Sequence, residues 1–194
     1  MDEPIPAKHA LRARLIAARR VMTESERGRA AAAITATALT SPELLAARTV
    51  TSYLSIGTEP STSELVRTLR SGGARVMMPV LRDDLDLDWA IYENPEQLSP
   101  GRRGLWTVDG PRLGLEAVSD ADVVIVPALA VGADGTRLGR GGGCYDRALA
   151  RVPPGRPVLA LLYAGEVLAV VPAEPHDRPV TAAVTPDGMH RFGP

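Results

Sequence analysis

The order of hydrophobic and polar positions predicts strands that alternate with helices. Short apolar or β-branched runs bounded by turn residues are typical of buried strands. Runs of this kind predict strands at 49–56, 75–80, 85–92, 122–127, 157–163 and 180–185. Since a parallel strand pair needs a crossover connection, this alternation favours an α/β fold with a parallel sheet of about six strands and helices on both faces.

Helix signals lie between these runs. Apolar residues at helical spacing predict an amphipathic helix over 7–21. Capping-box patterns at 23–26 and 61–64 predict helices that run to about residues 39 and 70, and a short turn of helix is expected at 42–46. Lys8, Arg12 and Arg19 fall on one side of the first helix, which makes them either a solvated helix face or a cationic clamp over an anionic ligand.

The most unusual segment is Thr136–Leu149, T-R-L-G-R-G-G-G-C-Y-D-R-A-L, which follows the run at 122–127 and precedes a helix predicted from Tyr145. Glycines let several backbone N–H groups approach one anion, and arginine matches phosphate oxygens. The segment contains Gly139, Gly141, Gly142 and Gly143 together with Arg137, Arg140 and Arg147. It therefore predicts a phosphate-binding loop, although it matches neither the Walker A pattern nor G-x-G-x-x-G, and a flexible connection is the alternative.

Composition narrows the function classes. The chain has 194 residues, 45% of them hydrophobic, and a net charge of −1, which gives no overall attraction to nucleic acid. No signal-type segment or long apolar run is present, so we expect no membrane span and a cytoplasmic location. The single cysteine, Cys144, excludes an internal disulfide, and three histidines are too few and too scattered for a zinc site. Any metal should be a hard, oxygen-bound ion.

Loops after the predicted strands carry further polar candidates, which should meet at the carboxyl edge of a parallel sheet. They include Glu59, Trp106 in the long connection 93–111, and the segment 172–177. We interpret the four aspartates at 83, 84, 86 and 88 as a solvated turn, because an EF-hand would need ligands that are missing.

Taken together, these motifs resemble the 5-formyltetrahydrofolate cyclo-ligase family over nearly the whole chain, which we take as a single domain, 1–194. The matching motifs are Lys8-x-x-x-Arg12, Tyr53-Leu-Ser-x-x-x-Glu59 with Thr62, Met78-Pro79, Pro100-Gly-x-x-Gly104, the run from Asp122 to Arg147, Val171-Pro-x-Glu-x-His-Asp177 and Val184-Thr185.

The resemblance implies a three-layer α/β/α sandwich with a mainly parallel sheet. It also implies an ATP- and Mg²⁺-dependent cyclisation of 5-formyltetrahydrofolate to 5,10-methenyltetrahydrofolate, with release of ADP and phosphate. Small-molecule substrates and a monomeric enzyme are expected. Arginine, lysine, Mg²⁺ and backbone amides suit phosphoryl transfer, which depends on positioning and charge neutralisation.

Residue roles follow from the same resemblance. It implies that Asp146 and Asp177 hold Mg²⁺, and that Arg140 and Asp146 are the catalytic residues. The residues implied for ATP binding are Lys8, Arg12, Arg137, Gly139, Arg140, Gly141, Gly142, Gly143 and Tyr145. Those implied for substrate binding are Leu54, Glu59, Arg140, Gly143 and Cys144.

Two positions depart from the family pattern. Cys144 stands where an aromatic residue commonly precedes the Tyr-Asp pair, and Gly132 replaces another aromatic. The first change leaves open a folate- or nucleotide-binding protein without turnover. An unrelated small-molecule kinase is the other alternative, and His176 would be its only candidate base.

Overall fold

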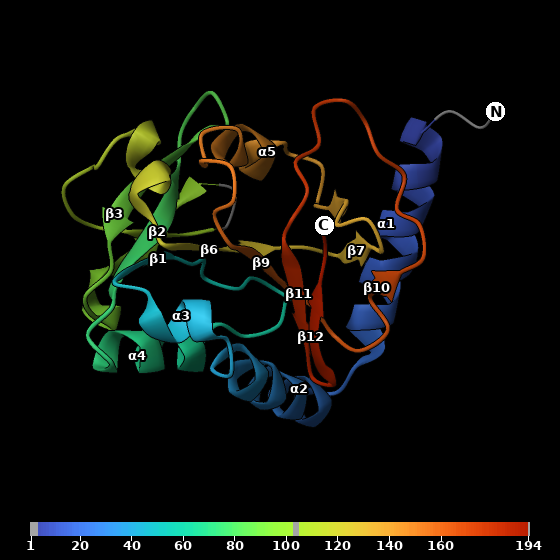
Figure 1. Ribbon diagram of the computed structural model, residues 1–194, viewed down its shortest axis with the longest axis horizontal. Coiled ribbons are helices and arrows are strands. Elements are labelled where there is room, and N and C mark those ends of the chain that lie inside the picture. The colour runs from blue at the N-terminus through green and yellow to red at the C-terminus, as the bar shows by residue number, and fades with distance from the viewer. Residues whose placement is uncertain (1–3, 103–104, 194) are drawn as a thin grey trace.

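A seven-stranded sheet forms the centre of the protein, with strand order β12-β11-β9-β6-β1-β2-β3 (Figure 1). The computed structural model describes residues 4–102 and 105–193. The strands of this sheet are β1 (Thr49–Thr51), β2 (Arg75–Leu81), β3 (Leu87–Ile91), β6 (Val123–Pro127), β9 (Val158–Leu161), β11 (Ala182–Thr185) and β12 (Gly188–Arg191). Its inner pairs are parallel, and the two edge strands β3 and β12 are antiparallel to their neighbours. All six predicted strands are present, and β12 is a seventh that the sequence analysis did not predict.

Helices cover both faces of this sheet (Figure 1). The helices are α1 (Pro4–Val21), α2 (Glu24–Ala38), α3 (Pro42–Ala46), α4 (Ser63–Ser71) and α5 (Cys144–Leu149), with the 3₁₀ turns η1 (Pro95–Gln97) and η3 (Leu115–Asp120). Because successive side chains of a strand point to opposite faces, β6 serves two cores. Val123 and Ile125 belong to the core with α2, α3 and α4, whereas Val124 and Val126 belong to the core with α5 and η3. The predicted three-layer α/β/α sandwich is therefore confirmed.

The first helix packs on a separate small sheet rather than on the central one. This sheet has the order β10-β7-β8 and consists of β7 (Ala130–Gly132), β8 (Arg137–Leu138) and β10 (Val167–Leu168). Leu15 of α1 packs there against Leu129, Leu138 and Val171. The sequence analysis placed the glycine loop directly after the strand at 122–127. In the structure the hairpin β7–β8 lies between β6 and the glycine loop.

The long connection between β3 and β6 is folded. It contains η1 and an antiparallel pair, β4 (Leu98–Pro100) with β5 (Trp106–Val108). Gly104, the last residue of the family motif in this connection, lies outside the described residues. The hairpin brings Trp106 to a cavity at the carboxyl edge of the central sheet.

Two local predictions need correction, and one is confirmed. The capping box of α2 is present, with the Thr23 side chain accepting from the Glu26 N–H. At α4, however, Ser61 does not cap: the helix begins after Thr62, whose hydroxyl donates instead to the Tyr53 carbonyl at 2.6 Å. Nor are all four aspartates solvated, because Asp86 and Asp88 are buried. Asp86 forms an ion pair with Arg151 at 2.6 Å, which compensates the carboxylate for its loss of water.

No helix in the described ranges 4–102 and 105–193 is long and apolar enough to cross a membrane.

Candidate active site

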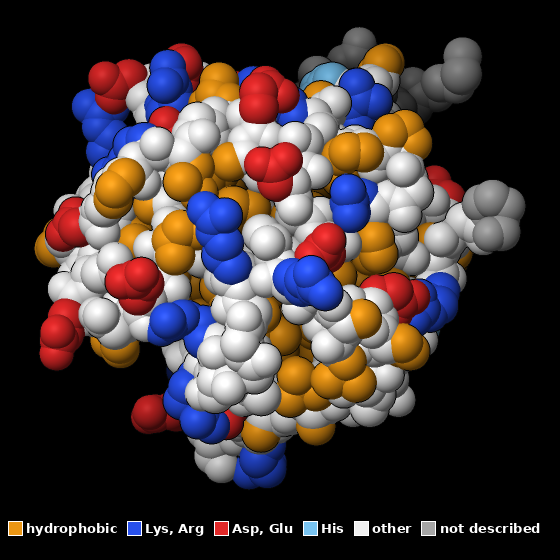
Figure 2. All heavy atoms as spheres, turned by 60° about the vertical axis from the view of Figure 1, so that its left-hand side comes forward, with side chains coloured by type: hydrophobic (Ala, Val, Ile, Leu, Met, Phe, Trp, Pro, Cys, Tyr) orange, Lys and Arg blue, Asp and Glu red, His pale blue; other side chains and the backbone are white. Residues whose placement is uncertain are grey.

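A cavity of 890 Å³ opens at the carboxyl ends of β1, β2 and β6. Its apolar wall includes Leu54, Met78, Leu81, Leu85, Leu105 and Trp106, and its polar wall is built by α1, the glycine loop, the start of α5 and the segment 174–177. Figure 2 brings the side of β2 and β3 forward, and hydrophobic side chains gather there among charged ones. The cavity can therefore hold a ligand with one anionic part and one flat apolar part.

The glycine loop forms one side of the polar wall, and its backbone requires glycine. Gly143 has φ +67° and lies directly before α5, in the left-handed region that side chains disfavour. At Gly139 the limit is space, because a Cβ atom would lie 2.7 Å from Nη1 of Arg137. The loop therefore exposes its backbone to the cavity, as an anion-binding loop must.

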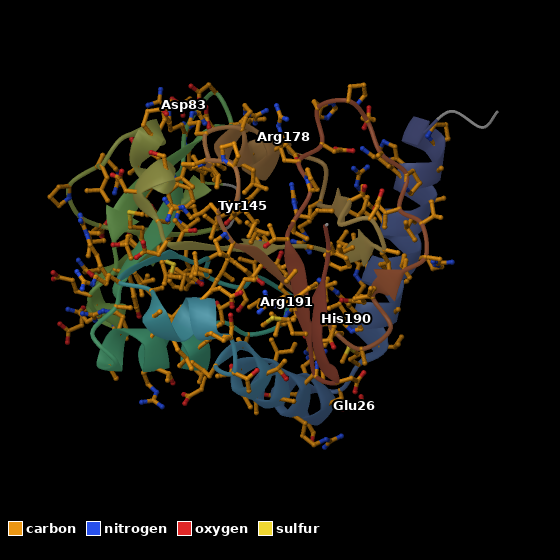
Figure 3. All side chains as sticks on the ribbon, in the orientation of Figure 1. Glu26, Asp83, Tyr145, Arg178, His190 and Arg191 are labelled. Carbon is orange, nitrogen blue, oxygen red and sulfur yellow. The ribbon has the colours of Figure 1, made fainter. Side chains whose placement is uncertain are left out.

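Arg137 lies beneath this loop and faces Asp146. Its Nη2 donates to Oδ1 of Asp146 at 2.7 Å, and only 3% of its side chain is exposed. The guanidinium also lies 5.9 Å from the centre of the Tyr145 ring. Asp146 accepts a second bond, 3.3 Å long, from the N–H of Arg178, a residue that lies near α5 (Figure 3). Asp146 is thus fixed from two directions.

Lys8 of α1 pairs with carboxylates of the segment 174–177, as Arg137 pairs with Asp146. Its Nζ lies 2.7 Å from Oε2 of Glu174 and 2.5 Å from Oδ2 of Asp177, and the side chain is 3% exposed. Burial raises the pKa of Asp177, but hydrogen bonds from Lys8 and from the Glu174 N–H outweigh it, so the pKa lies below its usual value. Asp177 is therefore a carboxylate at neutral pH.

The three basic residues predicted to lie on one side of the first helix, Lys8, Arg12 and Arg19, divide into two groups. Lys8 and Arg12 line the cavity, and Nε of Arg12 donates to the Gly139 carbonyl at 2.9 Å. Arg19 is not part of this site: it is buried about two turns beyond Arg12 along α1 and pairs with Glu166 at 2.7 Å. The solvated-face interpretation is wrong for Lys8 and Arg19, since both are buried.

Glu59 and Leu54 lie where the polar and apolar walls meet. Oε2 of Glu59 accepts from the Ile56 N–H at 3.0 Å, and its Oε1 lies 3.8 Å from Nε of Arg140. Burial raises the pKa of Glu59, and the Ile56 hydrogen bond and Arg140 offset this only in part. Desolvation also raises the pKa of Tyr145, which keeps its proton at neutral pH. Figure 3 shows Tyr145 below α5, towards the middle of the molecule.

Donor atoms of Glu174, His176 and Asp177 lie within 4.8 Å of one another, so this segment could hold a cation. The sequence analysis named Asp177 as a ligand and treated Glu174 only as a motif residue. It also assigned no role to Leu85 or Leu105 of the apolar wall. The glutamate inside the Pro-x-Glu-x-His-Asp motif was a signal for Glu174, whereas isolated leucines carry no such signal.

This site lies at the carboxyl edge of a parallel sheet and combines three features: a glycine loop framed by arginines, carboxylates beside it, and an adjoining apolar wall. Such a combination is typical of α/β enzymes that act on phosphate-containing ligands. Comparison with known proteins identifies the particular family. The sequence profile of the 5-formyltetrahydrofolate cyclo-ligase family matches residues 4–186, and the chain belongs to this family. It is therefore an enzyme, a ligase of folate metabolism.

Individual relatives agree with this assignment. The chain is 42% identical to the 5-formyltetrahydrofolate cyclo-ligase of Mycolicibacterium smegmatis over 147 residues, which are 73% of this chain and 75% of the relative. It is 33% identical to the enzyme of that name from Escherichia coli K12, over 76% of this chain and 83% of the relative. The solved structure of the 5,10-methenyltetrahydrofolate synthetase of Aquifex aeolicus has a TM-score of 0.83 and 26% identity, and covers 96% of this chain and 93% of that chain.

Proposed function

We propose that this protein, acting as one domain, uses ATP and Mg²⁺ to cyclise 5-formyltetrahydrofolate to 5,10-methenyltetrahydrofolate, with release of ADP and phosphate. The observation that carries this proposal is a single cavity in which the arginine-framed glycine loop adjoins an apolar wall with the buried carboxylate of Glu59. One part suits a polyphosphate and the other a flat heterocycle, so both reactants can lie side by side.

On the polar side, the loop amides of 139–143 and the cations around them would bind the ATP phosphates. Arg12 already contacts the Gly139 carbonyl and is well positioned to reach a phosphate beside it. We assign Lys8, Arg137 and Tyr145 to the same subsite. Lys8 and Arg137 pair with the carboxylates of Asp177 and Asp146, so they also hold these two side chains in position.

The carboxylates fit a magnesium ion. Mg²⁺ usually takes one or two protein carboxylates and completes its shell with phosphate oxygens and water. Asp146 and Asp177 supply that number beside the glycine loop, and the lowered pKa of Asp177 keeps it ionised. When bound, the ion would offset the negative charge of the phosphates.

On the apolar side, Leu54 would pack on the pterin ring and Glu59 would accept hydrogen bonds from its N–H edge. Arg140 lies between the two subsites: 44% of its side chain is exposed, and its Nε is 3.8 Å from Glu59. Gly143 and Cys144 would border the substrate at the start of α5.

The chemistry requires activation of the formyl group, because a formamide oxygen leaves poorly. The formyl oxygen attacks the γ-phosphorus, and the bond between this phosphorus and ADP breaks. The neighbouring amine then bonds to the formyl carbon and gives up its proton, and the C–O bond to phosphate breaks. Arg140, between the two subsites, would stabilise the charge that develops on the transferred phosphoryl group. Asp146 would hold Arg137 and the magnesium ion in position in the phosphate subsite.

The proposal is tested by mixing the protein with 5-formyltetrahydrofolate and MgATP and following the methenyl chromophore in the near ultraviolet. We expect turnover that needs both ATP and Mg²⁺ and that falls sharply in Arg140→Ala and Asp146→Ala. Binding of both ligands without a chromophore would favour a non-catalytic folate-binding protein, and phosphate transfer to a stable product would favour a kinase.

A further inference from the structure

The hairpin between β2 and β3 contains a backbone conformation that side chains disfavour. Leu85 has φ +65°, and it is the only residue other than glycine with a positive φ in the described part of the chain. The turn is closed by the Arg82 N–H donating to the Asp86 carbonyl at 3.0 Å and the Leu85 N–H donating to the Arg82 carbonyl at 3.2 Å. In three-residue hairpin loops of this kind the last position is left-handed and is ordinarily glycine or asparagine.

Leucine is an unfavourable choice there, because its Cβ crowds the neighbouring carbonyl. Strained residues persist where the surrounding structure holds them, and they gather at ligand-binding sites. Leu85 meets both conditions: it is half-buried, and it lines the cavity together with Leu81, Leu87 and Trp106. A glycine would ease the turn but would leave this part of the apolar wall empty.

Arg147 of α5 and Arg151, two residues after the end of this helix, hold the hairpin in place. Nη2 of Arg147 donates to the Leu85 carbonyl at 2.6 Å and to the Gly142 carbonyl at 3.1 Å. Nη2 of Arg151 donates to Oδ2 of Asp86 at 2.6 Å. One side chain thus links the hairpin tip to the glycine loop, and Leu85 is fixed at the junction of the apolar and phosphate-binding parts of the cavity.

We propose that Leu85 is a specificity-determining residue whose side chain packs on the ring system of the folate substrate. This proposal rests on the proposed function and adds a residue to it. Arg147 is then a positioning residue, since it acts on the substrate only through the backbone of Leu85 and Gly142.

Three substitutions separate the side chain from the backbone strain. Leu85→Gly and Leu85→Ala both remove the packing surface, but only glycine accepts φ +65° without strain. Leu85→Met keeps an apolar side chain of similar size in the same strained backbone. We expect both Gly and Ala variants to raise the KM for 5-formyltetrahydrofolate about tenfold or more, since lost apolar contact in a pocket has effects of that order.

The KM for MgATP should change less than about twofold, and Leu85→Met should stay near the wild type. In thermal unfolding, Leu85→Gly should melt above Leu85→Ala. If Leu85 had a purely structural role, the Gly and Ala variants would lose kcat or stability and keep the wild-type KM for 5-formyltetrahydrofolate. An unchanged folate KM in both variants would therefore overturn the inference.

The same experiment separates this inference from the proposed function. A wild-type protein that forms no methenyl product refutes the function, and calorimetric titration with 5-formyltetrahydrofolate then decides the role of Leu85. Binding that is about tenfold weaker in the Gly and Ala variants supports the role. Equal binding in all variants, or no binding to the wild type, refutes it.

Discussion

At the residue scale, the glycine loop depends on contacts that a single methyl group would disturb. Gly139→Ala places a Cβ 2.7 Å from Nη1 of Arg137, the side chain that fixes Asp146. We expect kcat/KM to fall about ten- to a hundredfold, because small displacements of positioning groups have effects of that size.

Gly28→Ala is the matched control, since nothing lies within 4 Å of its added Cβ in α2. It should leave activity unchanged and stabilise the protein by up to about 1 kcal/mol; equal activity of the two variants would contradict the assigned role of Arg137.

Glu59 gives a second prediction at this scale. Burial raises its pKa above the ordinary glutamate value of 4.5. If the carboxylate accepts from the substrate, activity should fall with acid through a pKa higher than that of an ordinary glutamate. Glu59→Gln should raise the folate KM at least about tenfold and lose this acid limb. A pH profile of kcat/KM measures both effects, and an acid limb that persists in the variant would assign it to another group.

The same raised pKa has a consequence for stability. A carboxyl group with a raised folded-state pKa is protonated in both states below about 4.5, and it then costs no stability. As the pH rises from the unfolded-state pKa to the higher folded-state pKa, the unfolded state releases its proton first. The free energy of unfolding of the wild type therefore falls over this interval. Glu59→Gln should therefore be more stable than the wild type at pH 7, and urea unfolding should show the difference vanishing near pH 4.

At the element scale, α1 is fixed by an ion pair beneath the site. Arg19 donates to both carboxylate oxygens of Glu166 at 2.7 Å and to the Ala128 carbonyl at 2.8 Å, and its guanidinium lies 5.3 Å from the centre of the Tyr163 ring. The same helix carries Lys8 and Arg12 into the cavity. The pair therefore sets the position of both cations.

Arg19→Met should destabilise the protein by about 3–5 kcal/mol, because Glu166 is left charged and buried. The double variant with Glu166→Gln removes that charge and keeps an acceptor for the Tyr163 N–H, so it should recover much of the loss. Urea unfolding of the two single variants and the double variant measures the coupling. We also expect a raised KM for MgATP in the double variant, and an unchanged one would show that α1 keeps its place without the pair.

Elements made by local pattern were predictable from the sequence, and those made by distant contacts were not. The apolar runs predicted six strands of the central sheet, whereas Gly188–Arg191 lacks β-branched residues and becomes β12 only because it pairs with β11. Likewise, Ser61 had the pattern of a cap, but Thr62 is held by the carbonyl of Tyr53 and moves the start of α4. Tertiary contacts decided both cases.

At the scale of the whole molecule, the candidate site was predictable to the extent that it follows from motifs. Lys8, Glu59, the glycine loop and Asp177 were chosen from separate segments, and all of them line one cavity. The Arg19–Glu166 pair and the Leu85–Arg147 contact join residues 147 and 62 positions apart and have no motif. Their roles depend on burial and backbone geometry, which a single sequence does not display.

Because the cavity is built from both ends of the chain, ligand binding should stabilise the whole fold. MgATP at about a hundred times its Kd should raise the free energy of unfolding by about 2.7 kcal/mol and the melting temperature by about 5–10 °C. A chelator should remove most of this shift if Asp146 and Asp177 hold the ion.

The variant Asp177→Asn tests this assignment. MgATP should raise its melting temperature only slightly, both with and without the chelator, and the melting temperature of each protein without ligand is the reference. The control Asp120→Asn changes an exposed carboxylate outside the cavity wall and should keep the full Mg²⁺-dependent shift. A full shift in Asp177→Asn would contradict its assignment as a magnesium ligand, because the ion would then be held by other groups.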